Sequence, residues 1–448
     1  MIVRSKRTET RGALRAVAAL AAPVLVLAGC GAGGGQADPG DGDGTITIWA
    51  HQGQDREVAA LQDAVDAFGD ANPDIAVELT LIPEADYTTT VTTASPDELP
   101  DVLEFDGPTM ASLVYNGKLS PIDDFVSEQT RSNATDSILA QGTLDGSLYG
   151  LGMFDSGLGV YGNAALLDEA GISFPEGMED AWTAQEFTDA LADLAAKDDD
   201  GRVLDVKQNY GFGSGSEWTT YAFSPVVWSA GGALIDGDSA DGALNTPGTV
   251  EALSLVQEWA GYTDANTDDS AFVSGDVALS LVGHWEYPNY SEALGEDLVV
   301  LPLPDFGHGV KTGQGSWAWG VAGTSDNGSA AGAFIDFLMA DDQVAAMTAA
   351  NGAPPGTKSA IETSDLYGPG GDLSLFADQL AATCGAGPVT ADCVAVPRPV
   401  TAGYPVITRQ FADAFAAIWE GGDVAEALDG AVTAIDTDFA DNDSFTIS

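Results

Sequence analysis

The stretch Ser280–Tyr290, SLVGHWEYPNY, ends an apolar run with an unusual concentration of functional side chains. Its last seven residues, His284–Tyr290, supply an imidazole, an indole, a carboxylate, an amide and two phenols. Such groups can stack on a flat apolar face of a ligand and exchange hydrogen bonds at its edge. A strand that ends inside a core needs no such sequence, so these side chains either pack in the core or line a binding site.

A second candidate stretch, Arg398–Phe411 (RPVTAGYPVITRQF), combines two arginines with Tyr404 ahead of a predicted helix. A guanidinium offers a fixed fork of donors that suits a carboxylate, a phosphate or neighbouring hydroxyl groups. In so acidic a chain, Arg398 or Arg409 could equally be the partner in a structural ion pair. The sequence leaves both interpretations open.

The chain is strongly acidic, with 69 Asp and Glu against 15 Lys and Arg among 448 residues. Residues 1–29 hold five of these cations and one of the acids, so 10 cations and 68 acids follow. Nucleic acids are bound by clusters of Lys and Arg, so we expect no nucleic-acid partner. An anionic small ligand is also disfavoured unless an arginine is placed specifically for it.

The sequence contains no recognisable catalytic constellation. It has no G-x-S-x-G or H-E-x-x-H motif and only three His. Carboxylates are so abundant that a pair of them gives no support for glycosidase chemistry. Asp198–Asp200 followed by Gly201 resembles a Ca²⁺ loop only weakly and is better explained as a solvated turn. We therefore expect neither a cofactor nor a metal.

The N-terminus has the pattern of an exported lipoprotein. Residues 1–15 carry five basic side chains, and the uncharged apolar run Ala16–Ala28 follows. That run is too short to span a bilayer, so residues 1–29 are predicted to be a signal peptide. It ends in LAGC, Leu27–Cys30, which resembles the lipobox in which the Cys is lipidated; a buried or disulfide-bonded Cys30 is the alternative. Residues 30–44, rich in Gly and Asp, are predicted to be a flexible tether.

Cys384 and Cys393 are the remaining cysteines, with eight residues between them. In an exported chain such a pair favours a disulfide over a metal site, since no His lies near enough in the sequence to complete a zinc set. We predict a Cys384–Cys393 disulfide.

Apolar periodicity predicts strands alternating with helices, hence an α/β fold with mainly parallel pairing. About 419 residues follow the signal peptide, which is too many for one typical core and implies two domains.

Thr183 and Glu186 have the spacing of a capping box, and Thr246-Pro247 has the pattern of a helix start. Predicted strands are Thr45–Ala50, Ile75–Ile82, Leu99–Phe105, Leu298–Pro304 and Trp317–Gly323. Predicted helices include one that ends at Asn72-Pro73, and Ser329–Met339, Asp342–Ala350, Val406–Trp419 and Val424–Phe439.

Six segments in order resemble the carbohydrate-type solute-binding proteins of ABC importers, the maltose-binding-protein-like group. Together they extend over nearly all of Thr45–Phe439. The segments are ITIWAHQGQDREVAALQDAVDAFGDANPDIAVEL, ELPDVLEFDG, SLYGLGMFDSGLGVYGNAALLDEAGI, AWTAQEFTDALADL, FVSGDVALSLVGHWEY, and VVLPLPDF followed by GSWAWGVAGTS.

The resemblance implies a bilobal, periplasmic-binding-protein-like (type II) α/β fold. In that fold two α/β lobes joined by hinge crossovers close over a ligand. Carried onto this chain, lobe 1 comprises 45–152 with 318–350, and lobe 2 comprises 153–317 with 351–448.

The resemblance also implies where ligand contacts lie. Sugars offer apolar C–H faces and many hydroxyl groups, so their sites combine aromatic platforms with planar polar side chains near strand ends. Trp285 stands where the family often has a stacking tryptophan, and Glu286 beside it could accept from a hydroxyl. On the family pattern the ligand-binding candidates are His51, Gln52, Asp106, Asp155, Ser156, Trp218, Tyr221, Trp285, Glu286, Gly315, Ser316, Trp317, Arg398, Tyr404 and Arg409.

Several candidates have an ordinary structural alternative. Asp106 could cap the segment after Pro108, and Asp155 or Ser156 could make a hinge hydrogen bond. Of Trp317 and Trp319, at most one is expected to meet a ligand.

By this resemblance the chain is a binding protein and not an enzyme. It would capture a neutral sugar, an oligosaccharide in preference, and deliver it to the permease subunits of an ABC importer. A lipid anchor would hold it, as a monomer, at the outer face of the cytoplasmic membrane. Two alternatives stay open: a glycerol-phosphate or phosphodiester receptor, which needs an arginine to neutralise the phosphate, and an exported glycoside hydrolase.

Overall fold

The computed structural model describes residues 44–213, 216–385 and 387–446. The predicted signal peptide (1–29), the lipid-attachment site Cys30 and all of the tether except Gly44 lie outside the described residues. Among the residues described, no helix is both long and apolar enough to cross a membrane.

The first of two main sheets has five strands in the order β2-β1-β3-β12-β4. β1 pairs in parallel with β2 and β3, whereas β12 pairs antiparallel with β3 and β4. Its strands are β1 (Gly44–Gln52), β2 (Ile75–Pro83), β3 (Val102–Asp106), β4 (Leu119–Ser120) and β12 (Trp317–Ala322). The neighbouring helices are α1 (Asp55–Ala71), α2 (Glu84–Thr93), α3 (Met110–Tyr115), α4 (Glu128–Asn133), α5 (Asp136–Gly142), α11 (Gly328–Leu338), α12 (Asp341–Asn351) and α13 (Lys358–Thr363).

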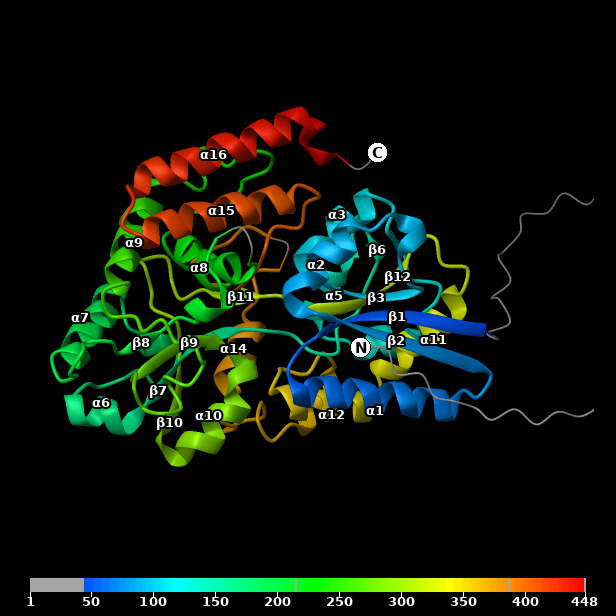
Figure 1. Cartoon of the computed structure of the whole chain (residues 1–448), viewed down its shortest axis with the longest axis horizontal. Helices are drawn as coiled ribbons and strands as arrows, with labels where there is room; N and C mark the ends of the chain where they lie inside the picture. The colour runs from blue at the N-terminus through cyan, green and yellow to red at the C-terminus, as the bar shows by residue number, and fades with distance from the viewer. Residues whose placement is uncertain (1–43, 214–215, 386, 447–448) are drawn as a thin grey trace, which may run out of the picture. The chain divides into compact units, whose positions relative to one another are not determined.

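This sheet is covered on both faces, which explains the apolar runs of its strands. Ile46, Ile48 and Ala50 of β1 are fully buried and pack with Phe68 of α1 and Phe334 of α11 in one apolar cluster. A second cluster, formed by β3 with α2 and α3, covers the opposite face. Figure 1 shows α1 and α12 side by side along the sheet.

The second main sheet has four strands in the order β10-β7-β9-β8. Its strands are β7 (Leu158–Asn163), β8 (Leu204–Asp205), β9 (Leu279–Gly283) and β10 (Leu298–Leu301). β7 and β9 are buried along their whole length. The neighbouring helices are α6 (Ala164–Ala170), α7 (Ala184–Ala195), α8 (Trp218–Ser229), α9 (Pro247–Trp259), α10 (Tyr287–Leu294), α14 (Ser374–Ala381), α15 (Tyr404–Trp419) and α16 (Val424–Asp441). The long helices α15 and α16 lie side by side (Figure 1).

The expectation of mainly parallel pairing is wrong. In the second sheet β7 pairs antiparallel with both β9 and β10, and in the first sheet β12 is antiparallel to its neighbours. The alternation of apolar residues reports only that a strand is buried. The direction of a strand depends on where a long connection returns to the sheet, and local periodicity carries no information about that.

The segments that cross between the two sheets are hydrogen-bonded to one another. The segment after β6 (Ser147–Leu148) pairs with β12: Leu151 N donates to Trp319 O at 3.1 Å, and Trp319 N donates back at 2.9 Å. The same segment also pairs with the chain that follows α12, where Gly356 N donates to Met153 O at 2.8 Å. The crossovers therefore form a common strip, not independent linkers.

The lobe limits taken from the resemblance stay predictions. Ala353 and Ala360 pack in the apolar cluster of the first sheet, whereas Tyr367 packs in the cluster of the second. The chain therefore changes from one core to the other after Ala360.

The helix starts that the sequence predicts are observed. The Thr183 hydroxyl accepts from Glu186 N at 3.2 Å and donates to the Glu186 carboxylate at 2.9 Å, forming the capping box of α7. The Thr246 hydroxyl accepts from Thr249 N, and Pro247 opens α9. Both caps satisfy amides that a helix leaves without partners at its first turn.

We expect Thr183→Ala to lower the free energy of unfolding by about 1 kcal/mol, because the first turn of α7 loses its side-chain acceptor. Urea unfolding followed by circular dichroism measures this loss. Thr183→Ser keeps the hydroxyl and is the control, so it should lose clearly less. Equal stability of the Ala variant and the wild type would contradict the role of the cap.

Candidate functional site

A buried polar arrangement between the two sheets is built around Arg398. Arg398 directly follows β13 (Ala395–Pro397) and is only 4% exposed. Its Nη1 and Nη2 donate to the two carboxylate oxygens of Asp106 at 3.0 and 2.8 Å, and Nη1 also donates to Glu217 Oε1 at 2.7 Å. Asp106 ends β3 of the first sheet, and Glu217 precedes α8 beside the second. One guanidinium thus joins acids from both halves of the structure.

Aromatic hydroxyls complete this arrangement. The guanidinium of Arg398 lies over the Tyr221 ring, 4.8 Å from its centroid, and the hydroxyls of Tyr221 and Ser156 are 2.6 Å apart. Tyr404 donates to Glu217 Oε1 in a short hydrogen bond. We call Asp106, Ser156, Glu217, Tyr221, Arg398 and Tyr404 the central cluster.

The charges of the central cluster constrain one another. Burial raises the pKa of Asp106, an effect that Arg398 opposes and Glu217 reinforces. Burial alone would lower the pKa of Arg398, but Asp106 and its other neighbours raise it well above its ordinary value. Arg398 Nε is buried and has no hydrogen-bond partner among the described residues. It is therefore a buried donor that these residues leave without an acceptor, which is unusual in a folded protein.

The carboxylate of Asp155 is held where the first crossover passes the central cluster. It is 2% exposed and accepts from the Ser137 hydroxyl, from Gln141 Nε2 at 3.2 Å and from Ser156 N at 2.8 Å. Gln314, at the end of β11 (Thr312–Gln314), donates to the same Ser137 hydroxyl. Burial raises the pKa of Asp155. Through Ser137, these contacts link the first crossover, which carries Asp155, to the segment that ends in Gln314. Asp155 thus makes a hydrogen bond at a crossover, the structural alternative to a ligand contact.

A separate buried pair lies at the end of β1. His51 Nδ1 lies 2.7 Å from Glu104 Oε2, and the imidazole stacks on the Trp317 ring with centroids 4.0 Å apart. Burial alone would lower the pKa of His51, but Glu104 and, more weakly, Glu57 raise it to about 9. A cavity of about 10 Å³, room for roughly one water, adjoins His51 and both glutamates.

Four rings from three segments form what we call the aromatic wall: Tyr210, Trp218, Tyr221 and Trp285. Trp285 is half-buried and meets Trp218 edge-on at 6.0 Å and Tyr221 at 6.4 Å. Trp218 is buried, and its Nε1 donates to Val206 O at 3.0 Å. Since Tyr221 also belongs to the central cluster, the wall and the cluster are continuous.

The structure brings most of the predicted residues into three adjoining groups. The central cluster holds Asp106, Ser156, Tyr221, Arg398 and Tyr404; the aromatic wall holds Trp218 and Trp285, with Glu286 behind it; and His51 pairs with Trp317. Gly315 adjoins Arg398, and the Ser316 carbonyl accepts from Gly107 N at 3.0 Å. Gln52 and Arg409 are exposed and belong to none of these groups.

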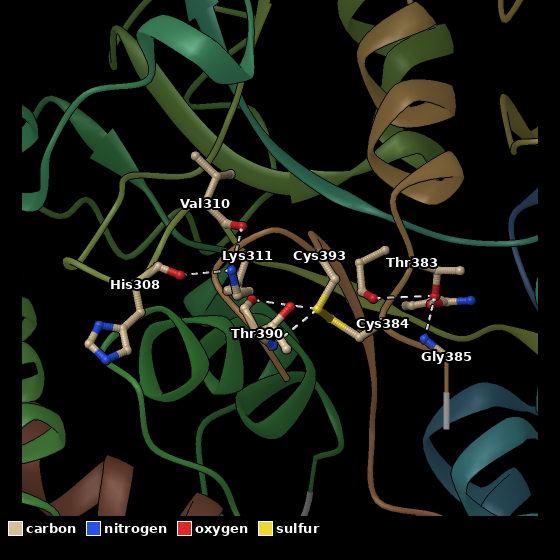
Figure 2. Close-up of a disulfide and its surroundings, with 10 residues drawn as sticks. His308, Val310, Lys311, Thr383, Cys384, Gly385, Thr390 and Cys393 are labelled. Atoms are coloured by element: carbon tan, nitrogen blue, oxygen red, sulfur yellow. Dashed lines mark hydrogen bonds between the residues drawn. A yellow bond between two sulfur atoms is a disulfide. The ribbon is translucent and has the colours of Figure 1, made fainter. Parts of the chain in front are cut away.

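The structure joins Cys384 and Cys393 in a disulfide. Figure 2 shows the bridge beside Thr383, whose hydroxyl donates to the Gln314 side chain at 2.5 Å, and near Lys311. Cys384 N donates to Ala395 O at 2.8 Å, so the bridged loop is bonded to β13, which leads into Arg398.

No group of three or more His, Cys, Asp or Glu among the described residues is arranged to hold a metal ion. The Asp198 carboxylate accepts from the backbone amides of Asp200 and Gly201 at 3.0 and 2.8 Å, which forms a turn.

A family model described as bacterial extracellular solute-binding protein matches residues 63–367. The chain belongs to this family. A Brucella abortus (strain 2308) protein named as a binding protein is 26% identical to this solute-binding protein over 287 residues, which cover 60% of this chain and 64% of the relative. The maltodextrin-binding protein MdxE of Bacillus subtilis (strain 168) is 27% identical over 174 residues, 35% of this chain and 37% of that protein. These alignments span less than two thirds of the relatives' own length.

Solved structures show the fold of this solute-binding protein. The GacH receptor of Streptomyces glaucescens, known unliganded and with acarbose, matches with a TM-score of 0.70 at 20% identity, covering 90% of this chain and 98% of the receptor. The cyclic alpha-maltosyl-1,6-maltose binding protein of Arthrobacter globiformis matches with 0.68 at 23% identity, covering 88% and 98%. A Listeria monocytogenes ABC substrate-binding protein with cycloalternan matches with 0.72 at 19% identity, covering 88% and 99%. The predicted bilobal α/β fold with hinge crossovers is confirmed.

Sequence reasoning missed the acids that define the electrostatics of these groups. Glu217 stands directly before Trp218 in the run GSGSEW. A single carboxylate among small residues was the only feature of that run that could have indicated a functional acid. Glu104 lies inside an apolar strand, VLEF, and a carboxylate at a buried strand position indicates a buried partner. Neither residue could be paired with its cation from sequence, because the partners lie 181 and 53 positions away.

We expect the free energy of unfolding to fall by about 3 kcal/mol as the pH rises from 6.5 through 9. The folded state keeps a proton on His51 up to a pKa of about 9, whereas unfolded His releases it near 6.5. The extra stability is therefore complete below pH 6.5 and is lost as the pH passes 9. Urea unfolding at pH 6.5 and 9.5 measures the difference.

Glu104→Gln is the matched control for this pH dependence, because it removes the charge that raises the pKa of His51. The variant should lose much less stability over the same pH range. An equal loss in the variant and the wild type would assign the pH dependence to other groups.

Proposed function

We propose that this solute-binding protein captures a neutral oligosaccharide between its two lobes and releases it to an ABC importer. The observation that carries the proposal is the continuity of the aromatic wall with the central cluster beside the crossovers. The wall offers ring faces for the C–H faces of sugars, and the cluster offers donors and acceptors for hydroxyl groups. A hydroxyl can both donate and accept, so it suits a cluster in which guanidinium, carboxylate and phenol alternate.

Relatives of the same fold support a carbohydrate as the ligand class. Acarbose, cyclic alpha-maltosyl-1,6-maltose and cycloalternan are held by the Streptomyces, Arthrobacter and Listeria proteins named above. MdxE, which aligns over part of this chain, is a maltodextrin-binding protein.

The glycerol-phosphate or phosphodiester alternative is not favoured. Arg398, the buried arginine it would need, already faces both Asp106 and Glu217. A phosphate entering beside these carboxylates would meet like charges that a single guanidinium does not offset.

Binding without turnover is part of the proposal. The two aspartates near the crossovers are engaged by protein donors: Asp106 is paired with Arg398, and Asp155 accepts from Gln141. The family is described as binding proteins.

The cellular setting is proposed from the sequence and the family. An extracellular solute-binding family implies export. We place a signal peptide at 1–29, a diacyl anchor on Cys30 and a tether at 30–44, which would hold the receptor at the outer face of the cytoplasmic membrane. Its proposed partners are the permease subunits of an importer, which it would meet as a monomer. From the resemblance we propose 45–152 with 318–350 as lobe 1 and 153–317 with 351–448 as lobe 2, with the segment 351–360, whose Ala353 and Ala360 pack in the core of the first sheet, leading into the last crossover.

The proposed function is tested by titration calorimetry of the purified protein with maltotetraose, a cyclic glucan, mannobiose, tagatose and glycerol 3-phosphate. We expect saturable binding of at least one oligosaccharide at one site, and none of glycerol 3-phosphate. Folded protein that binds no saccharide would refute the proposal. Binding of the phosphate alone would establish the alternative.

Trp285→Ala should weaken binding of that oligosaccharide at least about thirtyfold, equivalent to about 2 kcal/mol, because a central stacking ring is lost. Trp182→Ala is the control, since Trp182 is also half-buried and packs against the same core but lies outside the aromatic wall. Both variants should lose stability, but only Trp285→Ala should lose affinity. If the two variants bound the oligosaccharide with the same affinity, Trp285 would be a core residue and not a ligand contact.

A further inference from the structure

The indole of Trp285 is held in place by a hydroxyl group that comes from a different segment of the chain. Its indole Nε1 donates to the Tyr210 hydroxyl at 3.3 Å, and that hydroxyl donates to Glu286 Oε1 at 2.7 Å. Tyr210 ends the short helix η4 (Gln208–Tyr210), whereas Trp285 and Glu286 belong to η5 (His284–Glu286). The Tyr210 hydroxyl therefore fixes the indole from a segment about 75 positions away.

Glu286, the acceptor for Tyr210, lies beside the buried ammonium group of Lys207. The Lys207 side chain is 1% exposed, and its Nζ lies 2.5 Å from Asp269, 3.4 Å from Asp205 and 3.9 Å from Glu286. The same Nζ lies 5.6 Å from the centroid of the Tyr210 ring, within reach of a cation–π interaction. A buried cation is tolerated only among such partners, so they fix its place and, through it, that of Glu286.

The backbone of Lys207 supports the same conclusion. Lys207 adopts φ 54° and ψ 45°, a left-handed conformation that L-residues with long side chains rarely take. A residue stays in such a conformation where its surroundings determine it strongly. The turn that delivers Tyr210 is thus held by the buried ammonium group next to it.

Gly283 is the third element of the arrangement. Its φ of −92° and ψ of −176° are open to any residue, so the backbone does not call for glycine. A Cβ at this position would lie 2.1 Å from Cζ3 and 2.5 Å from Cη2 of Trp285. The indole lies over the Cα of Gly283, and only glycine leaves room for it there.

We propose that Tyr210 and Gly283 are positioning residues that hold the Trp285 indole in place as a stacking platform for a sugar ring, with Glu286 and Lys207 fixing Tyr210. The inference rests on the proposed function, because it takes Trp285 as a ligand contact. A platform fixed before binding loses less side-chain freedom when the ligand arrives, so its affinity is higher.

The test combines a readout without ligand and a readout with ligand on Tyr210→Phe and Gly283→Ala. The first variant removes only the hydroxyl, and the second adds only a methyl group. The indole N–H resonance of Trp285, assigned by its absence in Trp285→Phe, is followed in ¹H–¹⁵N spectra of the whole protein. Affinity for maltotetraose is measured by calorimetry on the same samples.

Tyr161→Phe is the matched control. Tyr161 of β7 is buried in the same core, and its hydroxyl has no hydrogen-bond partner among the described residues. Removing that hydroxyl should leave the Trp285 resonance and the affinity unchanged.

We expect both test variants to shift the Trp285 indole resonance and Tyr210→Phe to weaken binding roughly threefold to tenfold, the net worth of one hydrogen bond. An unmoved resonance in Tyr210→Phe would overturn the proposal, as would a moved resonance with unchanged maltotetraose affinity. If the wild type binds no saccharide, a moved resonance still establishes that Tyr210 positions Trp285, but the assignment of the platform to a sugar falls with the proposed function.

Discussion

The pairing of the buried Arg398 guanidinium with Asp106 and Glu217 constrains the rest of the structure. A guanidinium excluded from water is strongly unfavourable unless carboxylates or other acceptors surround it. One of the two carboxylates ends a strand of the first sheet, and the other precedes a helix that covers the second. The two halves must therefore meet where Arg398 lies. The pairing of β13 with β11 and the disulfide loop bonded to β13 hold the arginine at this meeting point.

Basic side chains are scarce in this chain, and several of them are buried in its interior. Four of the 10 Lys and Arg that follow residue 29 are buried: Lys118, Lys207, Lys311 and Arg398. Lys118 and Lys311 donate to backbone carbonyls, whereas Lys207 and Arg398 are paired with acids. The acidic excess is thus largely a property of the surface, which favours solubility, while the cations act as structural centres.

Besides the His51–Glu104 pair, two buried cations hold the aromatic rings of the candidate site. Arg398 lies over Tyr221, and Lys207 supports the Tyr210 hydroxyl that holds Trp285. Fixed rings beside hydrogen-bonding groups with satisfied charges favour a ligand that is flat, apolar on its faces and rich in hydroxyls. A strongly charged ligand would have to displace ion pairs that already compensate each other.

The sequence by itself determined the features that depend on local chemistry. Helix caps such as Thr183 and Thr246 and buried strands such as β1 follow from nearest-neighbour preferences and periodicity, which tertiary contacts did not override. The six segments that resemble the family indicated where candidate residues such as Asp106 and Trp285 lie, and the separate stretch Arg398–Phe411 supplied Arg398. Only the tertiary structure decided strand direction, the partners of buried charges, and which side chains support Trp285. Those properties join positions separated by tens to hundreds of residues, such as Asp106 with Arg398 and Tyr210 with Trp285. Local sequence carries no information on such distant pairs, because they form only when the chain brings its two sheets together.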